Sequence, residues 1–263
     1  MKRLILFSFL SLILIPLAIS NTPLPIVPKP VQEFVTGKQV IVSNEWTIYI
    51  SPRFIVDRYY ISSIFKDLNV EITNVPQKNK PLILIQPNKK LSENPEAYKL
   101  EISAKGKIII EANSENGVLY ALQSLRQIAQ SENNTIVLPV CKVIDEPAFP
   151  WRAFMLDESR HFQGMETVKM LIDEMARLKM NAFHWHLVDD PGWRIEIKKY
   201  PELTRIGSKR NFTHKDLSPE KWLEMFPHEK TYYTQSEISD IVEYAANRGI
   251  KIMPEIEVPG HAS

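Results

Sequence analysis

Cysteine and glycine are scarce in this 263-residue chain, which contains one cysteine, Cys141, and 8 glycines against 19 prolines. A single cysteine excludes an intramolecular disulfide, so the fold depends on its hydrophobic core. The chain also lacks a surplus of positive charge, because 32 Lys and Arg residues face 31 Asp and Glu residues. Nucleic-acid binding depends on such a surplus, so the sequence predicts no nucleic-acid partner.

The longest hydrophobic run lies at the N-terminus, directly after Lys2 and Arg3. It is shorter than the ~20 apolar residues that a membrane-spanning helix needs, and Pro16 lies near its end. The small residues of Ala18–Ser20 fit the cleavage site of a signal peptidase. We therefore expect residues 1–20 to be a cleaved signal peptide. The mature protein would then be exported, periplasmic or secreted, with no stable membrane span.

Residues 21–147 have the pattern of a small α+β accessory domain. Short segments rich in β-branched and aromatic residues predict strands at Thr47–Ile50, Leu82–Gln86, Tyr98–Ile102 and Lys107–Ala112. Gly106, between the last two, favours a hairpin turn. Apolar residues at helical spacing then predict a helix over Asn116–Ala129. Catalytic residue types do not concentrate here, so we predict a scaffold role.

Two prolines within Asp145–Pro150 predict a boundary, after which strands and helices alternate through residues 148–263. The predicted order is strand Arg152–Asp157, helix Glu166–Leu178, strand Asn181–Val188, a helix that begins at the capping box Thr234–Glu237, and strand Ile250–Glu255. This α/β rhythm fits an open doubly wound sheet and part of a (β/α)8 TIM barrel equally well. No glycine-rich phosphate loop follows these strands, which argues against nucleotide binding.

Charged residues follow each of the three predicted strands at its carboxyl end, where parallel β/α folds place their functional groups. They are Asp157 and Arg160 after the first strand, Asp189 and Asp190 followed by Arg194 after the second, and Glu255, Glu257 and His261 at the third. Acids together with Arg or His recur at the same edge in all three units, so we predict a functional site there.

The segments around these residues resemble the β-N-acetylhexosaminidases of glycoside hydrolase family 20. The resemblance is carried by Trp151–Phe162, His184–Arg194 and Pro254–His261, and upstream by Val27–Pro30 and Asn113–Tyr120. It implies an accessory domain followed by the first three β/α units of a TIM barrel. It also implies an exo-acting hydrolase that removes terminal N-acetylhexosamine residues.

Further implications of the resemblance concern the substrate site. Arg160, Asp189 and His261 would bind the terminal sugar of glycans that contain N-acetylglucosamine or N-acetylgalactosamine. A guanidinium suits this role because it donates paired, charge-assisted hydrogen bonds to adjacent oxygens. Supporting roles, which would orient Arg160 and His261, fall to four acids: Asp157, Asp190, Glu255 and Glu257.

The mechanism that the resemblance implies is substrate-assisted and needs neither a cofactor nor a metal. The acetamido oxygen of the substrate attacks the anomeric carbon, while an adjacent Asp-Glu pair orients the acetamido group and protonates the leaving oxygen. The family carries that pair at the end of the fourth barrel strand. We therefore expect the catalytic residues beyond Ser263, so that the chain is an inactive fragment of a longer enzyme.

Two alternatives remain open from the sequence. The chain fits a non-catalytic sugar-binding remnant that uses the same three residues. It also fits a metal-dependent amidohydrolase barrel, because His184 and His186 share one face of a strand.

We interpret His184 and His186 as buried, hydrogen-bonded core histidines, with Phe183 and Trp185 packing on the opposite face of the same strand. Trp193 fits stacking on a sugar and packing within a turn equally well.

Overall fold

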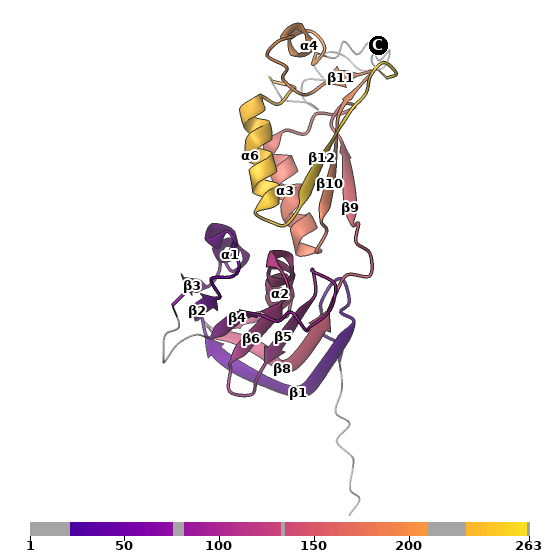
Figure 1. Cartoon of the computed structure of the whole chain (residues 1–263). Coiled ribbons are helices and arrows are strands. Elements are labelled where there is room, and N and C mark those ends of the chain that lie inside the picture. The colour runs from indigo at the N-terminus through magenta and orange to yellow at the C-terminus, as the bar shows by residue number, and fades with distance from the viewer. Residues whose placement is uncertain (1–21, 76–81, 133–134, 210–229, 262–263) are drawn as a thin grey trace, which may run out of the picture.

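The computed structural model describes residues 22–75, 82–132, 135–209 and 230–261. Their strands form two sheets, which occupy the lower and upper parts of Figure 1. The predicted signal peptide lies outside the described residues. Among the helices that are described, none has the length and apolar character needed to cross a membrane.

The first sheet has eight strands, and its helices lie on the face that is turned toward the second sheet (Figure 1). Its principal order is β1-β8-β5-β6-β4-β2-β3, and β7 pairs with β8. The elements are β1 (Gln32–Ser43), β2 (Glu45–Ile50), α1 (Arg58–Ile64), β3 (Asn69–Thr73), β4 (Ile83–Pro87), β5 (Tyr98–Ile102), β6 (Ile108–Ala112), α2 (Glu115–Ile128), β7 (Gln130–Glu132) and β8 (Thr135–Asp145).

The four strands and the helix predicted in this region are present as β2, β4, β5, β6 and α2. The hairpin is also present, because β5 and β6 are antiparallel and Gly106 has φ 79°. The two longest strands, β1 and β8, were not predicted. Their pairing shifts register between Val35 and Gln39, beside Gly37 at φ 73°, and this irregularity breaks the alternation that marks a strand in the sequence.

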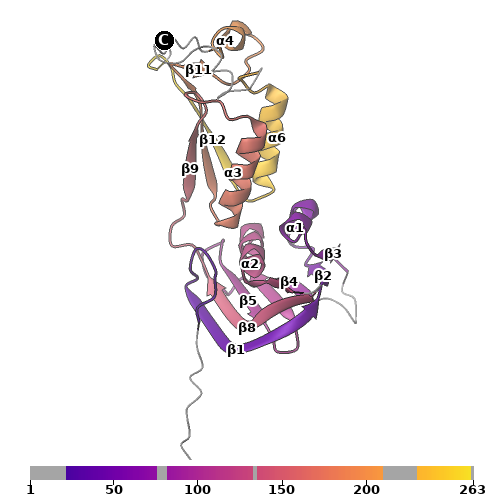
Figure 2. The ribbon, with the colours of Figure 1, turned by 180° about the vertical axis from the view of Figure 1, so that it is seen from behind.

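The second sheet holds three parallel strands in chain order, β9 (Ala153–Asp157), β10 (Ala182–Asp189) and β12 (Lys251–Ile256). The short strand β11 (Gly192–Trp193) pairs antiparallel with β10. Helices α3 (Met165–Arg177) and α6 (Gln235–Ala246) cover the same face of this sheet in both views, and α4 (Glu202–Arg205) lies beyond its far end (Figures 1 and 2). A doubly wound sheet carries helices on both faces. Parallel strands in chain order, with all helices on one face, are the arrangement of a TIM barrel. Of the two predicted architectures, the structure therefore supports the partial TIM barrel.

Local signals in the second region are confirmed. The Thr234 hydroxyl accepts from the backbone of Glu237, whose carboxylate accepts in return from the Thr234 amide. Past the end of α6, Gly249 has φ 73°. A side chain at Gly249 would also lie 2.6 Å from Oδ1 of Asn116, at the start of α2. Glycine here therefore permits both the turn and the close approach of the two parts of the molecule.

Helix α2 and a set of buried cations join the two sheets. Lys179, which follows α3, extends its Nζ to within 3.0 Å of Oδ2 of Asp145 at the end of β8 and 2.8 Å of the Tyr98 hydroxyl. Only 5% of Lys179 is exposed. Its backbone has φ 59°, a left-handed conformation that glycine usually occupies after a helix. The ion pair with Asp145 requires a lysine side chain, which explains why lysine and not glycine occupies this backbone conformation.

Two arginines make further contacts across the same junction. Arg152 bonds both carboxylate oxygens of Glu96 at 3.0 and 3.1 Å and the Tyr120 hydroxyl at 2.8 Å. Arg248, after α6, stacks 4.5 Å from the ring centroid of Tyr60 in α1. These contacts hold the first β/α units against the accessory sheet.

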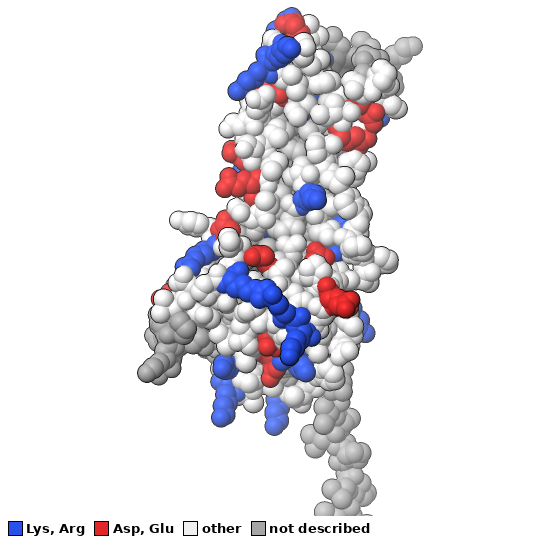
Figure 3. Space-filling view, viewed as in Figure 1, with Lys and Arg blue, Asp and Glu red and all other residues white. Residues whose placement is uncertain are grey.

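Charges of both signs are interspersed on the face shown in Figure 3, among wide uncharged areas. This distribution agrees with the near balance of 32 basic and 31 acidic residues in the chain.

Candidate functional site

The carboxyl ends of β9, β10 and β12 lie side by side and carry the residues predicted for the site. Strand β9 ends at Asp157 and β10 ends at Asp189. Parallel pairing places His186 of β10 opposite Asp157 on one side and opposite Glu255 of β12 on the other. The sheet register therefore concentrates acids and histidines at one edge.

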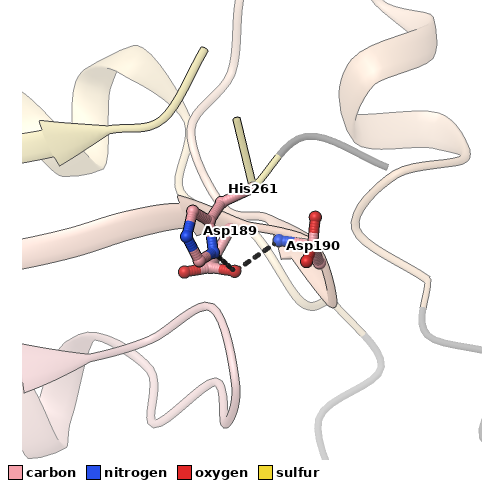
Figure 4. A group of neighbouring side chains, drawn as sticks. All are labelled: Asp189, Asp190 and His261. Atoms are coloured by element: carbon pink, nitrogen blue, oxygen red, sulfur yellow. Dashed lines mark hydrogen bonds and ion pairs between the residues drawn. The ribbon is translucent and has the colours of Figure 1, made fainter. Parts of the chain in front are cut away.

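Asp189 is the centre of this cluster and is 6% exposed. Its Oδ1 accepts from the Asp190 amide at 2.7 Å and lies 3.3 Å from Nδ1 of His261 (Figure 4). Its Oδ2 lies 2.7 Å from Nη2 of Arg160 and 3.1 Å from Nε2 of His186. Burial raises the pKa of Asp189, but the Asp190 amide, Arg160 and His186 outweigh burial and hold that pKa below its usual value. Asp189 is therefore a fixed carboxylate.

Arg160 projects from the loop after β9 and is held by two acids. Its Nη1 lies 3.0 Å from Oδ2 of Asp157, and its Nη2 bonds Asp189. The Arg160 amide also donates to Oδ1 of Asp157 at 3.0 Å. The side chain is still 47% exposed. This combination orients a guanidinium and leaves part of it accessible to a ligand.

His186 contacts both Glu255 and Arg160. Nδ1 of His186 lies 2.6 Å from Oε2 of Glu255, while its Nε2 faces Asp189. Burial disfavours the charged imidazole, but Glu255, Asp157 and Asp189 together raise the His186 pKa. Hydrogen bonding to His186 lowers the pKa of Glu255. Nε2 of His186 also lies 3.3 Å from Nη1 of Arg160, so both ring nitrogens have polar partners.

The interpretation of the two histidines as buried is correct for His186 and wrong for His184. His186 is 5% exposed, whereas the His184 side chain is 40% exposed. Met155 and Met253, the register partners of His184 on either side, are 50% and 40% exposed. Among the described residues, the face of the sheet that carries these three side chains is therefore partly exposed to solvent. His184 nevertheless bonds Glu255.

Of the four predicted supporting acids, the structure places Asp157 directly against Arg160. Glu255 holds His184 and His186 instead of Arg160 or His261, because the sheet register sets it opposite His186. Glu257 lies beside Glu255 and helps to lower its pKa. Asp190 reaches the cluster through its backbone amide.

Asp189, Asp190 and His261 each offer one ligand atom, and these atoms lie within 4.8 Å of one another. Two carboxylates and an imidazole form a donor set that divalent metals accept. However, the oxygens of Asp189 already contact Arg160, His186 and His261, as well as an amide. A bound cation would compete with these groups, so the geometry favours a hydrogen-bonded network. His184 and His186, the ligands of the amidohydrolase alternative, likewise bond one carboxylate, that of Glu255.

Phe183, Trp185 and Trp193 all pack within the structure. Phe183 and Trp185 are both fully buried beneath the helices, as predicted. Trp193 packs against the core, and its indole N–H donates to the Ile195 carbonyl at 2.6 Å. Of its two predicted roles, the structure therefore favours packing within the turn.

Glu158, which follows Asp157 at the end of β9, is a fully buried acid. Its carboxylate accepts from the Gln163 amide at 2.7 Å and from the Tyr233 hydroxyl at 2.8 Å. Burial raises the pKa of Glu158 to about 7, although these two donors and Arg194 oppose the shift. The sequence contains Glu158 within the motif, but nothing in the spacing shows that it is buried.

Replacement of Glu158 with glutamine is expected to change the pH dependence of stability. The folded state retains the Glu158 proton up to about pH 7, whereas the unfolded chain loses it near 4.5. This acid therefore contributes stability below pH 4.5 that is lost as the pH rises through 7. Relative to wild type, Glu158→Gln should gain stability over this range, by about 3 kcal/mol at most. Urea unfolding at pH 5 and pH 8 measures the difference, with the exposed Glu243→Gln as control. Parallel pH profiles for wild type and Glu158→Gln would contradict the expectation.

Arg194 and Tyr233 are further residues to which sequence reasoning assigned no role. Arg194 is 3% exposed and Tyr233 is 1% exposed. A buried arginine is uncommon, but only the tertiary structure shows that Arg194 is one.

The chain matches two sequence profiles of one family over almost all of its described length. Residues 149–263 match the profile described as glycosyl hydrolase family 20, catalytic domain, and residues 24–146 match that described as glycosyl hydrolase family 20, domain 2.

Among similar proteins is a β-hexosaminidase of Porphyromonas gingivalis, 38% identical over 251 residues, a match that covers 90% of this chain and 30% of that protein. A β-hexosaminidase of Vibrio furnissii is 42% identical over 180 residues, covering 68% of this chain and 29% of that protein. The crystal structure of an exo-β-N-acetylglucosaminidase from Vibrio harveyi, in complex with N-acetylglucosamine, has a TM-score of 0.76 at 33% identity. It covers 91% of this chain and 37% of that one. The chain thus spans about a third of the length of these relatives.

Proposed function

The chain belongs to glycoside hydrolase family 20, and from this premise we propose that the full-length protein is an exo-acting β-N-acetylhexosaminidase. The substrates would be glycans with a terminal, non-reducing N-acetylhexosamine. The single observation that carries the proposal is the position of Arg160. Its guanidinium is oriented by Asp157 and Asp189 at the carboxyl edge of a partial TIM barrel, and it is half exposed there.

In this proposal Arg160 binds two hydroxyls of the terminal sugar. The two acids that hold Arg160 fix its plane, so it loses less conformational freedom when the sugar binds. A neutral sugar cannot replace the ion pairs with Asp157 and Asp189, so we expect it to bind at the exposed part of the guanidinium while those pairs remain.

Asp189 and His261 complete the sugar-binding edge. Asp189 accepts hydrogen bonds on both of its oxygens, which makes it the rigid point that relates Arg160 to His261. His261 is exposed and lies beside Asp189, so its imidazole is accessible to a bound sugar.

The bond-breaking groups would lie outside this chain. By the family resemblance, hydrolysis is substrate-assisted, with the acetamido oxygen as nucleophile and an adjacent Asp-Glu pair after the fourth barrel strand. We propose that this pair follows Ser263 in the full-length protein, and that residues 1–263 alone bind the sugar weakly and do not hydrolyse it.

The proposal extends to the location of the protein and to the sugar that it recognises. The basic and apolar N-terminus supports export by a signal peptide, to the periplasm or to the outside of the cell. The chain is also similar to an N,N'-diacetylchitobiase of Vibrio harveyi, which supports N-acetylglucosamine-containing substrates.

Hydrolysis of an aryl N-acetyl-β-glucosaminide by the full-length protein and by residues 21–263 tests the proposal. We expect activity in the long form and none in the short form. Activity in the short form would overturn the position given to the catalytic pair. A long form that binds N-acetylglucosamine without hydrolysing the glycoside would instead identify a sugar-binding protein. A chelator that abolishes activity would favour the metal-dependent alternative.

A further inference from the structure

We propose that Arg194 is a positioning residue for substrate binding, because its guanidinium fixes the backbone segment from which Arg160 projects. The inference rests on the proposed function in one respect, the assignment of Arg160 as a sugar contact. The contacts of Arg194 themselves are independent of that assignment.

The first two contacts lie immediately before Arg160 in the chain. Nε of Arg194 donates to the Glu158 carbonyl at 3.1 Å, and its Nη2 donates to the Ser159 carbonyl at 2.9 Å. A planar guanidinium that holds two consecutive carbonyls fixes the orientation of both peptide groups. The direction in which Arg160 leaves the loop follows from these orientations.

The opposite side of the guanidinium contacts two other segments. Nη1 of Arg194 donates to the Ser208 carbonyl at 2.6 Å and to the Thr231 carbonyl at 3.1 Å. Ser208 follows α4, whereas Thr231 precedes α6. Arg194, which is 3% exposed, therefore ties the Arg160 loop to two other loop segments.

Arginine and a neighbouring glycine are both required by this geometry. Lysine has a single ammonium, which cannot reach four carbonyls spread around a plane. A Cβ at Gly192 would overlap the guanidinium of Arg194, whose Nε would lie 2.7 Å away. Gly192 is needed here for space, and its own carbonyl accepts from the Ser159 hydroxyl at 2.8 Å.

The remainder of the loop is fixed by Glu158. Its carboxylate holds the Gln163 amide, and its own amide donates to the His186 carbonyl at 3.0 Å. The loop is thus attached at both ends, so displacement of Arg194 should rotate the peptide groups before Arg160 without unfolding the sheet.

Kinetics of the full-length protein on an aryl N-acetyl-β-glucosaminide provide the first test. Arg194→Lys should lower kcat/KM at least tenfold, mainly through a higher KM. If Arg194 acts through Arg160, the double variant Arg194→Lys/Arg160→Ala should be no worse than Arg160→Ala alone. Multiplicative losses in the double variant would overturn the proposal.

Amide hydrogen exchange supplies a readout that does not need activity. Arg194→Lys, and separately Gly192→Ala, should increase exchange in residues 158–163 while α3 remains protected. Arg205→Lys, the same chemical change at the exposed last residue of α4, should leave both exchange and kinetics unchanged. Unaltered exchange over residues 158–163 in both test variants would refute the positioning role, even if the wild type proved inactive and the proposed function failed.

Discussion

Replacement of Arg160 with alanine in the full-length protein is expected to reduce kcat/KM for an aryl N-acetyl-β-glucosaminide by roughly 30- to 700-fold. This range corresponds to about 2–4 kcal/mol, the contribution of two charge-assisted hydrogen bonds to a bound sugar. The loss has a second source, because removal of the guanidinium takes from Asp157 and Asp189 the cation that both of them contact. The pKa of Asp189, now held low in part by Arg160, should therefore rise.

Steady-state kinetics across a range of pH measure both effects. Arg160→Lys should recover only part of the lost activity, since an ammonium keeps the charge but not the planar fork. Arg205→Ala serves as control because Arg205 pairs with Glu202 on the exposed surface of α4. An unchanged kcat/KM in Arg160→Ala would remove Arg160 from the sugar site and with it the main support for the proposed function.

The second large effect is expected at the junction of the two sheets. Lys179→Met should lower the free energy of unfolding by about 3–5 kcal/mol, the usual cost of removing one partner from a buried ion pair. Asp145 is 8% exposed, and its carboxylate would lose the ammonium 3.0 Å away. The Tyr98 hydroxyl, which Lys179 also bonds, would lose the same partner.

Urea unfolding of the full-length protein measures this loss. Lys179→Met/Asp145→Asn should recover much of the stability, since the uncompensated charge is gone. The exposed Lys66→Met tests for a general effect of replacing lysine with methionine. Equal stabilities for Lys179→Met and Lys66→Met would show that the pair does not join the sheets.

Local structure in this protein was largely predictable, because the signals that define it lie close together in the chain. The capping box at Thr234 and the apolar face of α3 act over one or two turns of helix. Strand β1 escaped prediction because its pairing with β8 is irregular, and the sequence of β1 does not reveal its distant partner.

In the candidate site, too, the sequence predicted what depends on neighbours in the chain and not what depends on distant residues. The sequence placed Asp157, Asp189 and Glu255 at the ends of three parallel strands, which was sufficient to expect them together. It did not predict that Glu255 would hold His186 and not Arg160, because this depends on the register between β10 and β12.

By itself, then, the sequence determined the family, the order of the β/α units and the residues at their carboxyl ends. The tertiary structure alone decided which acids face Arg160, that Glu158 and Arg194 are buried behind it, and that Lys179 crosses to Asp145. The physical reason is the distance along the chain between the residues that interact. Helical periodicity, caps and turns are set by neighbours in the chain, whereas burial, pKa shifts and ion pairs depend on residues that only folding brings together.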